Sequence, residues 1–193
     1  MKRVCVYTGG YEGRQAIFAE TARAMGEELA RREVELVYGG GQVGLMGILA
    51  DTVLENGGRV IGVIPEKLAA REIAHHDLQE LRIVGSMHER KALMETLSCG
   101  FIALPGGIGT LEETCEALTW AQLGVHKKPC GLINAGGYYD HFLAFIDTMV
   151  DNGFLKAVHR ELLLVDKDPA ALLDRMAVFE PPEFKRWMAR EDV

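Results

Sequence analysis

Short apolar runs alternate along this chain with longer segments of helical periodicity, and this alternation constrains the fold more than any other feature. The runs are rich in β-branched residues and are bounded by Gly, Pro or Asp. Such a pattern is typical of βαβ units, in which a helix joins two neighbouring parallel strands. Glycine clusters follow three of the runs, so the turns at those strand ends can bring backbone N–H groups close to a ligand.

The pattern predicts an α/β fold, a doubly wound, Rossmann-like parallel sheet with helices on both faces. Expected strands lie at Arg3–Tyr7, Glu35–Tyr38, Val60–Ile64, Leu81–Val84, Gly100–Leu104, Cys130–Ile133 and Leu162–Val165. Expected helices lie at Arg14–Arg32, Leu45–Asn56, Met87–Ser98, Leu111–Gln122, Tyr139–Asn152 and Pro169–Ala177. We expect a single domain over residues 1–193, ending in a polar C-terminal tail at 181–193 with Trp187 as its anchor.

Composition excludes several classes of function. Lys and Arg number 21 and Asp and Glu 28, giving a net charge of −7, and no basic run is present, so we expect no nucleic-acid partner. No stretch is long and apolar enough to cross a membrane or act as a signal peptide. The cysteines lack a CxxC pair, which favours a cytoplasmic protein with packed, reduced thiols at Cys5, Cys99, Cys115 and Cys130. The histidines are dispersed, so we expect no metal site.

The segment Leu104-Pro105-Gly106-Gly107-Ile108-Gly109-Thr110-Leu111-Glu112-Glu113 is the sharpest motif, since a strand end passes through a glycine turn into a helix. Unpaired N–H groups and the positive dipole end of a helix start favour an anion there. No GK[ST] follows, which argues against a P-loop. The alternative is structural, because Thr110 and Glu113 have capping-box spacing, with Thr110 as N-cap. A phosphate in this turn would be repelled by Glu112 and Glu113, so we expect at least one of them to have a compensating role.

Two further motifs follow strand ends. Arg90 and Lys91 open the expected helix at Met87–Ser98, where they can converge on an anion or form a solvated basic pair. Gly39, Gly41 and Gly44 match GxGxxG after a strand, which superficially indicates a dinucleotide site with Glu66 as the ribose acid. A tight turn with close helix packing explains these glycines equally well.

Taken in order, these motifs resemble the LOG (Lonely Guy) family of cytokinin riboside 5′-monophosphate phosphoribohydrolases. The likeness covers the chain from Val4 to about Leu163 and includes Tyr38-Gly39-Gly40-Gly41-Gln42-Val43-Gly44-Leu45-Met46-Gly47, Met87-His88-Glu89-Arg90-Lys91 and Pro105-Gly106-Gly107-Ile108-Gly109-Thr110-Leu111-Glu112-Glu113. The first loop departs from the family, because Thr8-Gly9-Gly10-Tyr11-Glu12-Gly13 stands where the family commonly has CGSS. Family members are often labelled lysine decarboxylases, yet no lysine here stands out as a Schiff-base candidate.

The resemblance implies hydrolysis of the N-glycosidic bond of adenine-type nucleoside 5′-monophosphates, giving the free base and ribose 5-phosphate. It implies Arg90 and Glu113 as the catalytic pair. Substrate-binding residues would be Gly40, Glu72, Met87, Lys91, Gly106, Gly107, Ile108, Gly109, Thr110, Leu111, Glu112 and Thr119. It also implies no cofactor, and a homodimer with its sites near the interface. Chemically, Glu113 would stabilise an oxocarbenium-like sugar while Arg90 orients the nucleotide.

Two other functions remain open at this point. A non-catalytic carrier of a nucleotide or a molybdopterin-type cofactor would use the same phosphate cradle, although it would have no need to keep Arg90 and Glu113 together. An NAD(P) oxidoreductase depends only on Gly39, Gly41, Gly44 and Glu66.

Overall fold

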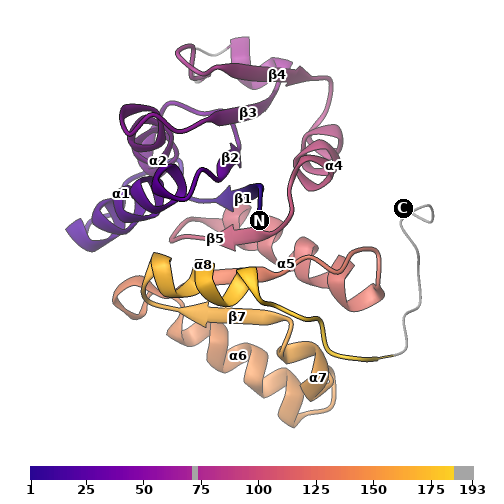
Figure 1. Cartoon of the computed structure of the whole chain (residues 1–193). Helices are drawn as coiled ribbons and strands as arrows, with labels where there is room; N and C mark the ends of the chain where they lie inside the picture. Colours follow the sequence, from indigo (N-terminus) through magenta and orange to yellow (C-terminus); the bar gives the residue numbers. More distant parts are fainter. Residues whose placement is uncertain (71–73, 185–193) are drawn as a thin grey trace.

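The computed structural model describes residues 1–70 and 74–184, in which seven parallel strands form one sheet (Figure 1). The strand order is β4-β3-β2-β1-β5-β6-β7. The strands are β1 (Arg3–Tyr7), β2 (Glu35–Tyr38), β3 (Val60–Pro65), β4 (Glu80–Val84), β5 (Phe101–Ala103), β6 (Cys130–Ile133) and β7 (Leu163–Asp166). All seven expected strands are present, and the predicted α/β fold class is confirmed.

The helices form layers on the two faces of the sheet. Helices α1 (Ala16–Arg31), α2 (Gly44–Glu55) and α8 (Pro169–Ala177) share one apolar cluster with the sheet, and α1 and α2 lie side by side (Figure 1). Helices α4 (Met87–Leu97) and α5 (Ile108–Leu123) bury Met94 and Ala117 against the opposite face. Helix α6 (Asp140–Asp151) covers the β6–β7 end of the sheet. The short elements α3 (Glu66–Leu68), η2 (Ala135–Gly137) and α7 (Ala157–Arg160) were not predicted.

The order of the strands reverses between β1 and β5. After β4 the chain returns through α4 to β5, which pairs with β1 through Cys5 and Phe101. The loops that follow β1 and β5 therefore leave the sheet in divergent directions at their carboxyl ends. Ligands of open parallel sheets bind in the crevice that forms at such a switch point.

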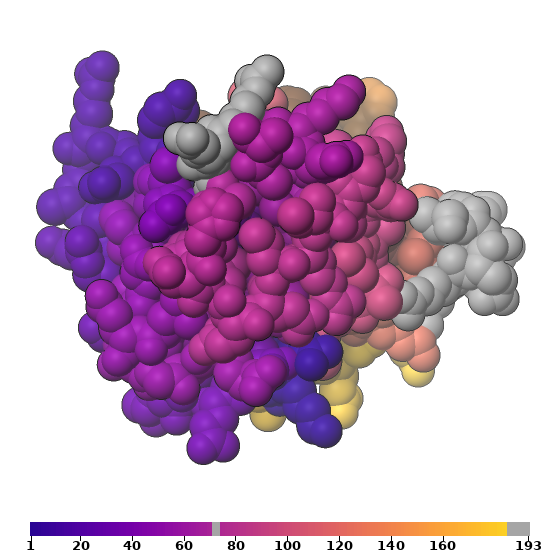
Figure 2. Space-filling view, turned by 90° about the horizontal axis from the view of Figure 1, so that it is seen from above, coloured from indigo at the N-terminus to yellow at the C-terminus, as the bar shows by residue number. Residues whose placement is uncertain are grey.

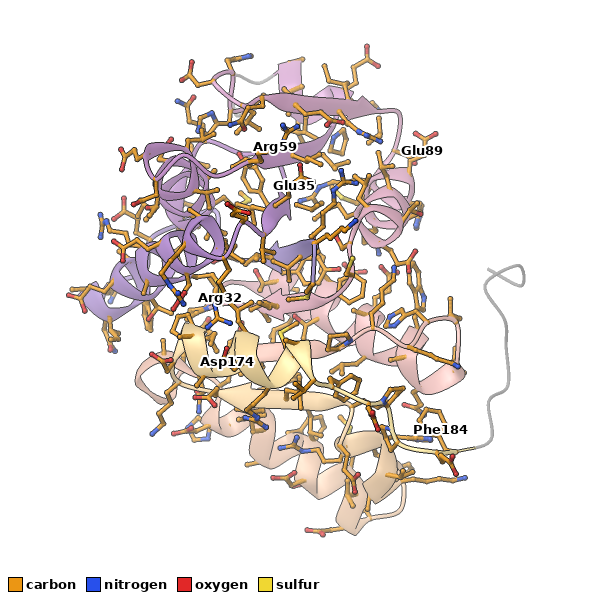
Figure 3. The ribbon with its side chains drawn as sticks, viewed as in Figure 1. Arg32, Glu35, Arg59, Glu89, Asp174 and Phe184 are labelled. Atoms are coloured by element: carbon orange, nitrogen blue, oxygen red, sulfur yellow. The ribbon has the colours of Figure 1, made fainter. Side chains whose placement is uncertain are left out.

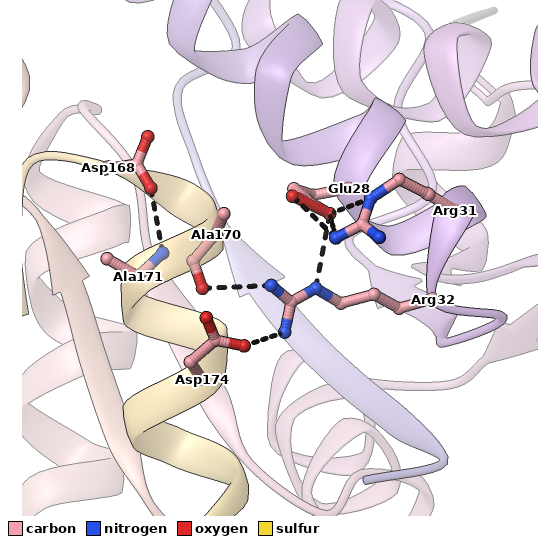
Figure 4. Close-up of polar contacts among 7 residues, drawn as sticks. All are labelled: Glu28, Arg31, Arg32, Asp168, Ala170, Ala171 and Asp174. Carbon is pink, nitrogen blue, oxygen red and sulfur yellow. Dashed lines mark hydrogen bonds and ion pairs between the residues drawn. The ribbon is translucent and has the colours of Figure 1, made fainter.

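A polar link joins the first and last helices far from this crevice. Arg32, just after α1, pairs with Asp174 of α8 at 2.6 Å and donates to the carbonyl of Ala170 at 3.1 Å (Figures 3 and 4). The Asp168 side chain caps α8 by accepting from the N–H of Ala171 at 2.8 Å. Because Asp174 is mostly exposed, we attribute little stability to the ion pair itself and more to the cap.

The sheet has an exposed edge at β4. The surface seen from above in Figure 2 is formed mainly by the purple and magenta part of the chain that contains β3, β4 and α4. Ile83 of β4 is 59% exposed, whereas β3 is buried along its whole length. The predicted helices on both faces therefore cover the centre of the sheet but leave this edge partly exposed.

The cysteine predictions are partly wrong. Cys5 and Cys130 are buried in strands, and burial raises the pKa of the Cys130 thiol to about 12. Cys99 and Cys115 are exposed instead of packed, because Cys99 lies in the turn before β5 and Cys115 lies on a helix position turned away from the sheet. The expected tail anchor, Trp187, lies outside the described residues. Across the described ranges, no helix combines the length and apolar character needed to cross a membrane.

Candidate active site

A cavity of about 470 Å³ lies at the carboxyl ends of β1 and β5. Six parts of the chain surround it: the loop after β1, the start of α1, the start of α2, Arg90 of α4, the turn from β5 into α5, and Tyr138 after η2. Its lining comprises Thr8, Gly9, Gly10, Tyr11, Glu12, Gly13, Phe18, Leu45, Met46, Arg90, Pro105, Gly106, Gly107, Gly109, Thr110, Glu113 and Tyr138. The cavity therefore occupies the switch point that the topology creates.

The start of α5 contributes Gly107, Gly109 and Thr110 to the lining of this cavity. Gly107 is the N-cap residue and has no side chain to satisfy the N–H groups of Ile108, Gly109 and Thr110, which also lack intrahelical acceptors. A Cβ added at Gly107 or Gly109 would meet no atom within 4 Å, so the backbone is open to a ligand. Such donors, together with the helix dipole, favour an anion at this position.

The predicted capping box is wrong. Helix α5 begins at Ile108, two residues before the expected N-cap, so Thr110 lies inside the first turn. The cause is the extended conformation of Gly107 together with the absence of a Cβ at Gly106, where a Cβ would collide with the Thr110 hydroxyl. Thr110 is buried, and Glu113 lies one turn further along the same helix.

Arg90 and Glu113 form an ion pair on the cavity wall. Arg90 Nη1 lies 3.0 Å from Glu113 Oε1, and the two side chains are only 13% and 11% exposed. Arg90 Nε also donates to the carbonyl of Val63 in β3 at 3.0 Å. Burial raises the pKa of Glu113, although the nearby Arg90 cation opposes that shift. The site thus holds a carboxylate and a fixed cation in the same cavity as the start of α5.

Lys91 lies next to Arg90 in sequence but forms ion pairs with different residues. Its Nζ lies 2.6 Å from Glu112 and 2.9 Å from Glu116, so it links α4 to α5. Burial lowers the pKa of Lys91, but its bonds to the two glutamates outweigh that effect and raise the pKa overall. The solvated basic pair considered for Arg90 and Lys91 is therefore wrong, because both side chains are largely buried and paired.

The structure brings only part of the predicted substrate-binding set to the cavity. Arg90 and Glu113 line it together with Gly106, Gly107, Gly109 and Thr110. Met87 contacts the lining residue Arg90, whose Nη1 donates a hydrogen bond to the Met87 sulfur. Predicted residues outside the lining are Gly40, Met87, Lys91, Ile108, Leu111, Glu112 and Thr119. Glu72 lies outside the described residues.

The GxGxxG glycines serve contacts within the protein. A Cβ at Gly39 would overlap Arg90 Nη2, and a Cβ at Gly44, which has a φ of +60°, would overlap the backbone of Gly10. Neither they nor Gly41 line the cavity. The geometry matches the tight-turn alternative, with the addition that Gly39 makes room for the arginine.

Residue patterns did not reveal several residues that build the site. The carbonyl of Val63 fixes Arg90, Thr8 holds the turn after β5, and Phe18 and Tyr138 form an aromatic part of the wall. The position of Thr8 after the first strand was the one available signal for it. The partners of Tyr138 depend on strand order, which local patterns do not give.

Fold and site together define a Rossmann-like protein whose cavity at the switch point contains a helix start and the Arg90–Glu113 ion pair. A family model described as "Possible lysine decarboxylase" matches residues 46–176. A probable cytokinin riboside 5′-monophosphate phosphoribohydrolase of Oryza sativa subsp. japonica is 48% identical over 180 residues, covering 93% of this chain and 79% of the relative. The enzyme of that name designated LOG, from the same plant, is 47% identical over 93% of this chain and 74% of its own. The chain therefore belongs to the LOG family.

Solved structures with this fold include proteins of other functions. A molybdenum cofactor binding protein from Rippkaea orientalis matches with a TM-score of 0.69 at 19% identity, covering 92% of this chain and 96% of that one. The molybdenum cofactor carrier protein of Chlamydomonas reinhardtii matches with a TM-score of 0.69 at 23% identity, covering 92% and 99%. At these identities the likeness establishes the shared fold alone.

Proposed function

We propose that this protein hydrolyses the N-glycosidic bond of adenine-type nucleoside 5′-monophosphates, such as AMP or a cytokinin riboside 5′-monophosphate. The products are the free base and ribose 5-phosphate. The observation that carries the proposal is the Arg90–Glu113 pair, which shares one cavity with the anion-binding start of α5. The names of relatives at 47–48% identity support the same reaction.

The geometry suits the charges of this reaction. Cleavage of the bond between ribose C1′ and the base builds positive charge on the sugar and negative charge on the departing purine. With the 5′-phosphate bound at Ile108, Gly109 and Thr110, the Glu113 carboxylate can stabilise the sugar cation and orient the attacking water. Arg90 holds that carboxylate and offers a cation to the nucleotide.

Lysine decarboxylation is not supported by the site. A lysine that forms a Schiff base must lose its proton, which requires a lowered pKa. Lys91 is the lysine nearest the candidate pair in sequence, and its two glutamate partners raise its pKa instead.

A non-catalytic carrier is the second candidate, favoured by the fold shared with molybdenum cofactor carriers. A carrier would bind a phosphate ester at the same helix start and release it unchanged. It would gain nothing from a buried carboxylate beside the sugar, because Glu113 repels an anionic ligand. Incubation with AMP separates the two functions, since a carrier binds AMP without releasing adenine.

We also infer a cytoplasmic homodimer with sites near the interface, built from a single domain. The four free cysteines support the location, and the 59% exposed Phe145 on α6 supports a partner surface. Light scattering on the purified protein measures the dimer directly. A monomer at micromolar concentration would contradict this part of the proposal.

The test of the function is a panel of nucleoside 5′-monophosphates assayed for ribose 5-phosphate and free base. Wild-type protein should release adenine from AMP, or N6-isopentenyladenine from the N6-isopentenyl analogue. Glu113→Gln and Arg90→Ala should each lose about a hundredfold or more in kcat/KM. Matched controls are Glu35→Gln and Arg59→Ala. These two residues form an ion pair at the amino ends of β2 and β3 (Figure 3). If all four variants kept the wild-type rate, the assignment of the pair would be wrong.

A further inference from the structure

The turn after β5 is held by donors from the loops of both neighbouring strands. The carbonyl of Leu104 accepts from the Tyr139 hydroxyl at 2.6 Å. The carbonyl of Pro105 accepts from the Thr8 hydroxyl at 3.0 Å and from the N–H of Gly9 at 3.1 Å. Because β5 lies between β1 and β6, the loops after these two strands flank the turn.

The next carbonyl, that of Gly106, accepts a hydrogen bond from the Tyr138 hydroxyl. This carbonyl belongs to the Gly106–Gly107 peptide, which directly precedes the first helical residue of α5. Two successive glycines have the largest conformational freedom of any dipeptide. The bond from Tyr138 therefore restrains the part of the turn that could otherwise rotate most easily.

Tyr138 delivers this hydroxyl from a rigid position. Its ring packs edge to face against Phe18, with 5.3 Å between centroids, and against Tyr139, with 4.9 Å between centroids. Tyr139 is itself buried and donates its N–H to the Asn134 side chain at 2.8 Å. The ring is thus wedged between two aromatic neighbours while its hydroxyl reaches the turn.

The exposure of Tyr138 distinguishes it from a core tyrosine. The residue is 45% exposed and lines the cavity, whereas Tyr139 is 2% exposed. A hydrogen bond that competes with water adds little to the free energy of folding. Its effect should fall on the conformation of the turn and so on what the turn binds.

We propose that Tyr138 is a positioning residue, which fixes the Gly106–Gly107 peptide so that the donors at the start of α5 are preorganised for the substrate's 5′-phosphate. The inference rests on the proposed function for the identity of the ligand. Preorganisation lowers the entropic cost of ordering the turn when the anion binds. Tyr138 itself makes no contact with a reacting atom in this account.

The test is Tyr138→Phe, which removes the hydroxyl and keeps the packed ring. The dissociation constants of ribose 5-phosphate and adenine are measured by calorimetry, with kcat and KM for AMP. We expect ribose 5-phosphate to bind about three- to tenfold more weakly, which is the range a single hydrogen bond supplies, and KM to rise by a similar factor. Adenine binding and the melting temperature should stay at the wild-type values, because neither depends on the conformation of the turn.

Tyr38→Phe is the matched control. Its buried hydroxyl has no partner among the described residues, and it lies outside the cavity lining, so its removal should leave ribose 5-phosphate binding unchanged. Unchanged ribose 5-phosphate binding in Tyr138→Phe overturns the proposal. An equal loss of ribose 5-phosphate and adenine binding, or a lowered melting temperature, also overturns it, because it shows a general structural role.

The proposed function and this inference fail separately. If the wild-type protein binds ribose 5-phosphate but releases no adenine from AMP, the proposed hydrolase activity is refuted. The dissociation constants of ribose 5-phosphate in wild type and Tyr138→Phe still decide the role of Tyr138. Wild-type protein that binds no ribose 5-phosphate refutes the inference.

Discussion

Replacing Gly39 by alanine should disable Arg90 without a direct change to the site. A Cβ at Gly39 would overlap Arg90 Nη2 and lie 3.3 Å from both Arg90 Cζ and Met46 Sδ. Non-bonded atoms such as this Cβ and nitrogen have their optimal separation at about 3.5 Å. The Arg90 guanidinium must therefore move away from the new Cβ by more than about 1 Å. That shift is incompatible with both of its anchors, the 3.0 Å bonds to the Val63 carbonyl and to Glu113.

The expected cost follows from the displacement. A misplacement of about 1 Å in a catalytic arrangement can reduce the rate about a hundredfold, or about 2.7 kcal/mol in transition-state free energy. Adenine release from AMP gives kcat/KM, and circular dichroism with thermal melting checks the fold. Gly57→Ala is the control for a backbone change outside the cavity lining: a Cβ there meets no atom within 4 Å, and its φ of +75° can lower stability but does not move Arg90. Gly39→Ala with kcat/KM within twofold of wild type would refute the role assigned to the position of Arg90.

Four further outcomes are expected. Because burial raises the pKa of Glu113, kcat/KM should fall with decreasing pH through a midpoint above 4.5, and this limb should vanish in Glu113→Gln. Lys91→Met should move the limb to higher pH, since the Lys91 cation holds the pKa of Glu113 down, and should cost about 1 to 2 kcal/mol of unfolding free energy in urea titrations. Burial lowers the pKa of His126 to about 4. The neutral imidazole therefore contributes fully to stability above pH 6.5, and this contribution is lost as the pH falls toward 4. Urea titrations should show the free energy of unfolding falling by up to about 3 kcal/mol over this range, and the fall should be absent in His126→Gln. Tyr38→Phe should raise stability by about 1 kcal/mol, because it removes a buried hydroxyl with no partner in the described part of the chain, and a lowered melting temperature would contradict this.

The strands and most helices could be predicted because each is encoded locally. β-Branched runs bounded by glycine, proline or aspartate located all seven strands, and the start of α4 at Met87 agrees with its expected start. The start of α5 was misplaced because a threonine three residues before a glutamate resembles a cap. The conformation of Gly107 decided otherwise, and that conformation depends on contacts outside the helix.

The site could be predicted only in part, for the same reason. Arg90 and Glu113 were predicted as a pair from the resemblance to the LOG family, and the structure places their charged groups 3.0 Å apart. The roles of Val63 and Tyr138 depend on which strands are neighbours, and no local pattern encodes that. The partnership of Lys91 with the glutamates of α5 likewise appears only once α4 and α5 pack against each other.

The return of the chain from β4 to β5 has a consequence for assembly. Arg90 lies on α4, which follows β4, the last strand along the chain in the first half of the sheet. Glu113 lies on α5, which follows β5, the first strand along the chain in the second half. Neither fragment of a chain cut between α4 and β5 contains both charges. If mixing two such fragments restored adenine release from AMP, the two halves would have assembled with Arg90 next to Glu113. Activity that depends on this ion pair can therefore be used to measure complete assembly of the fold.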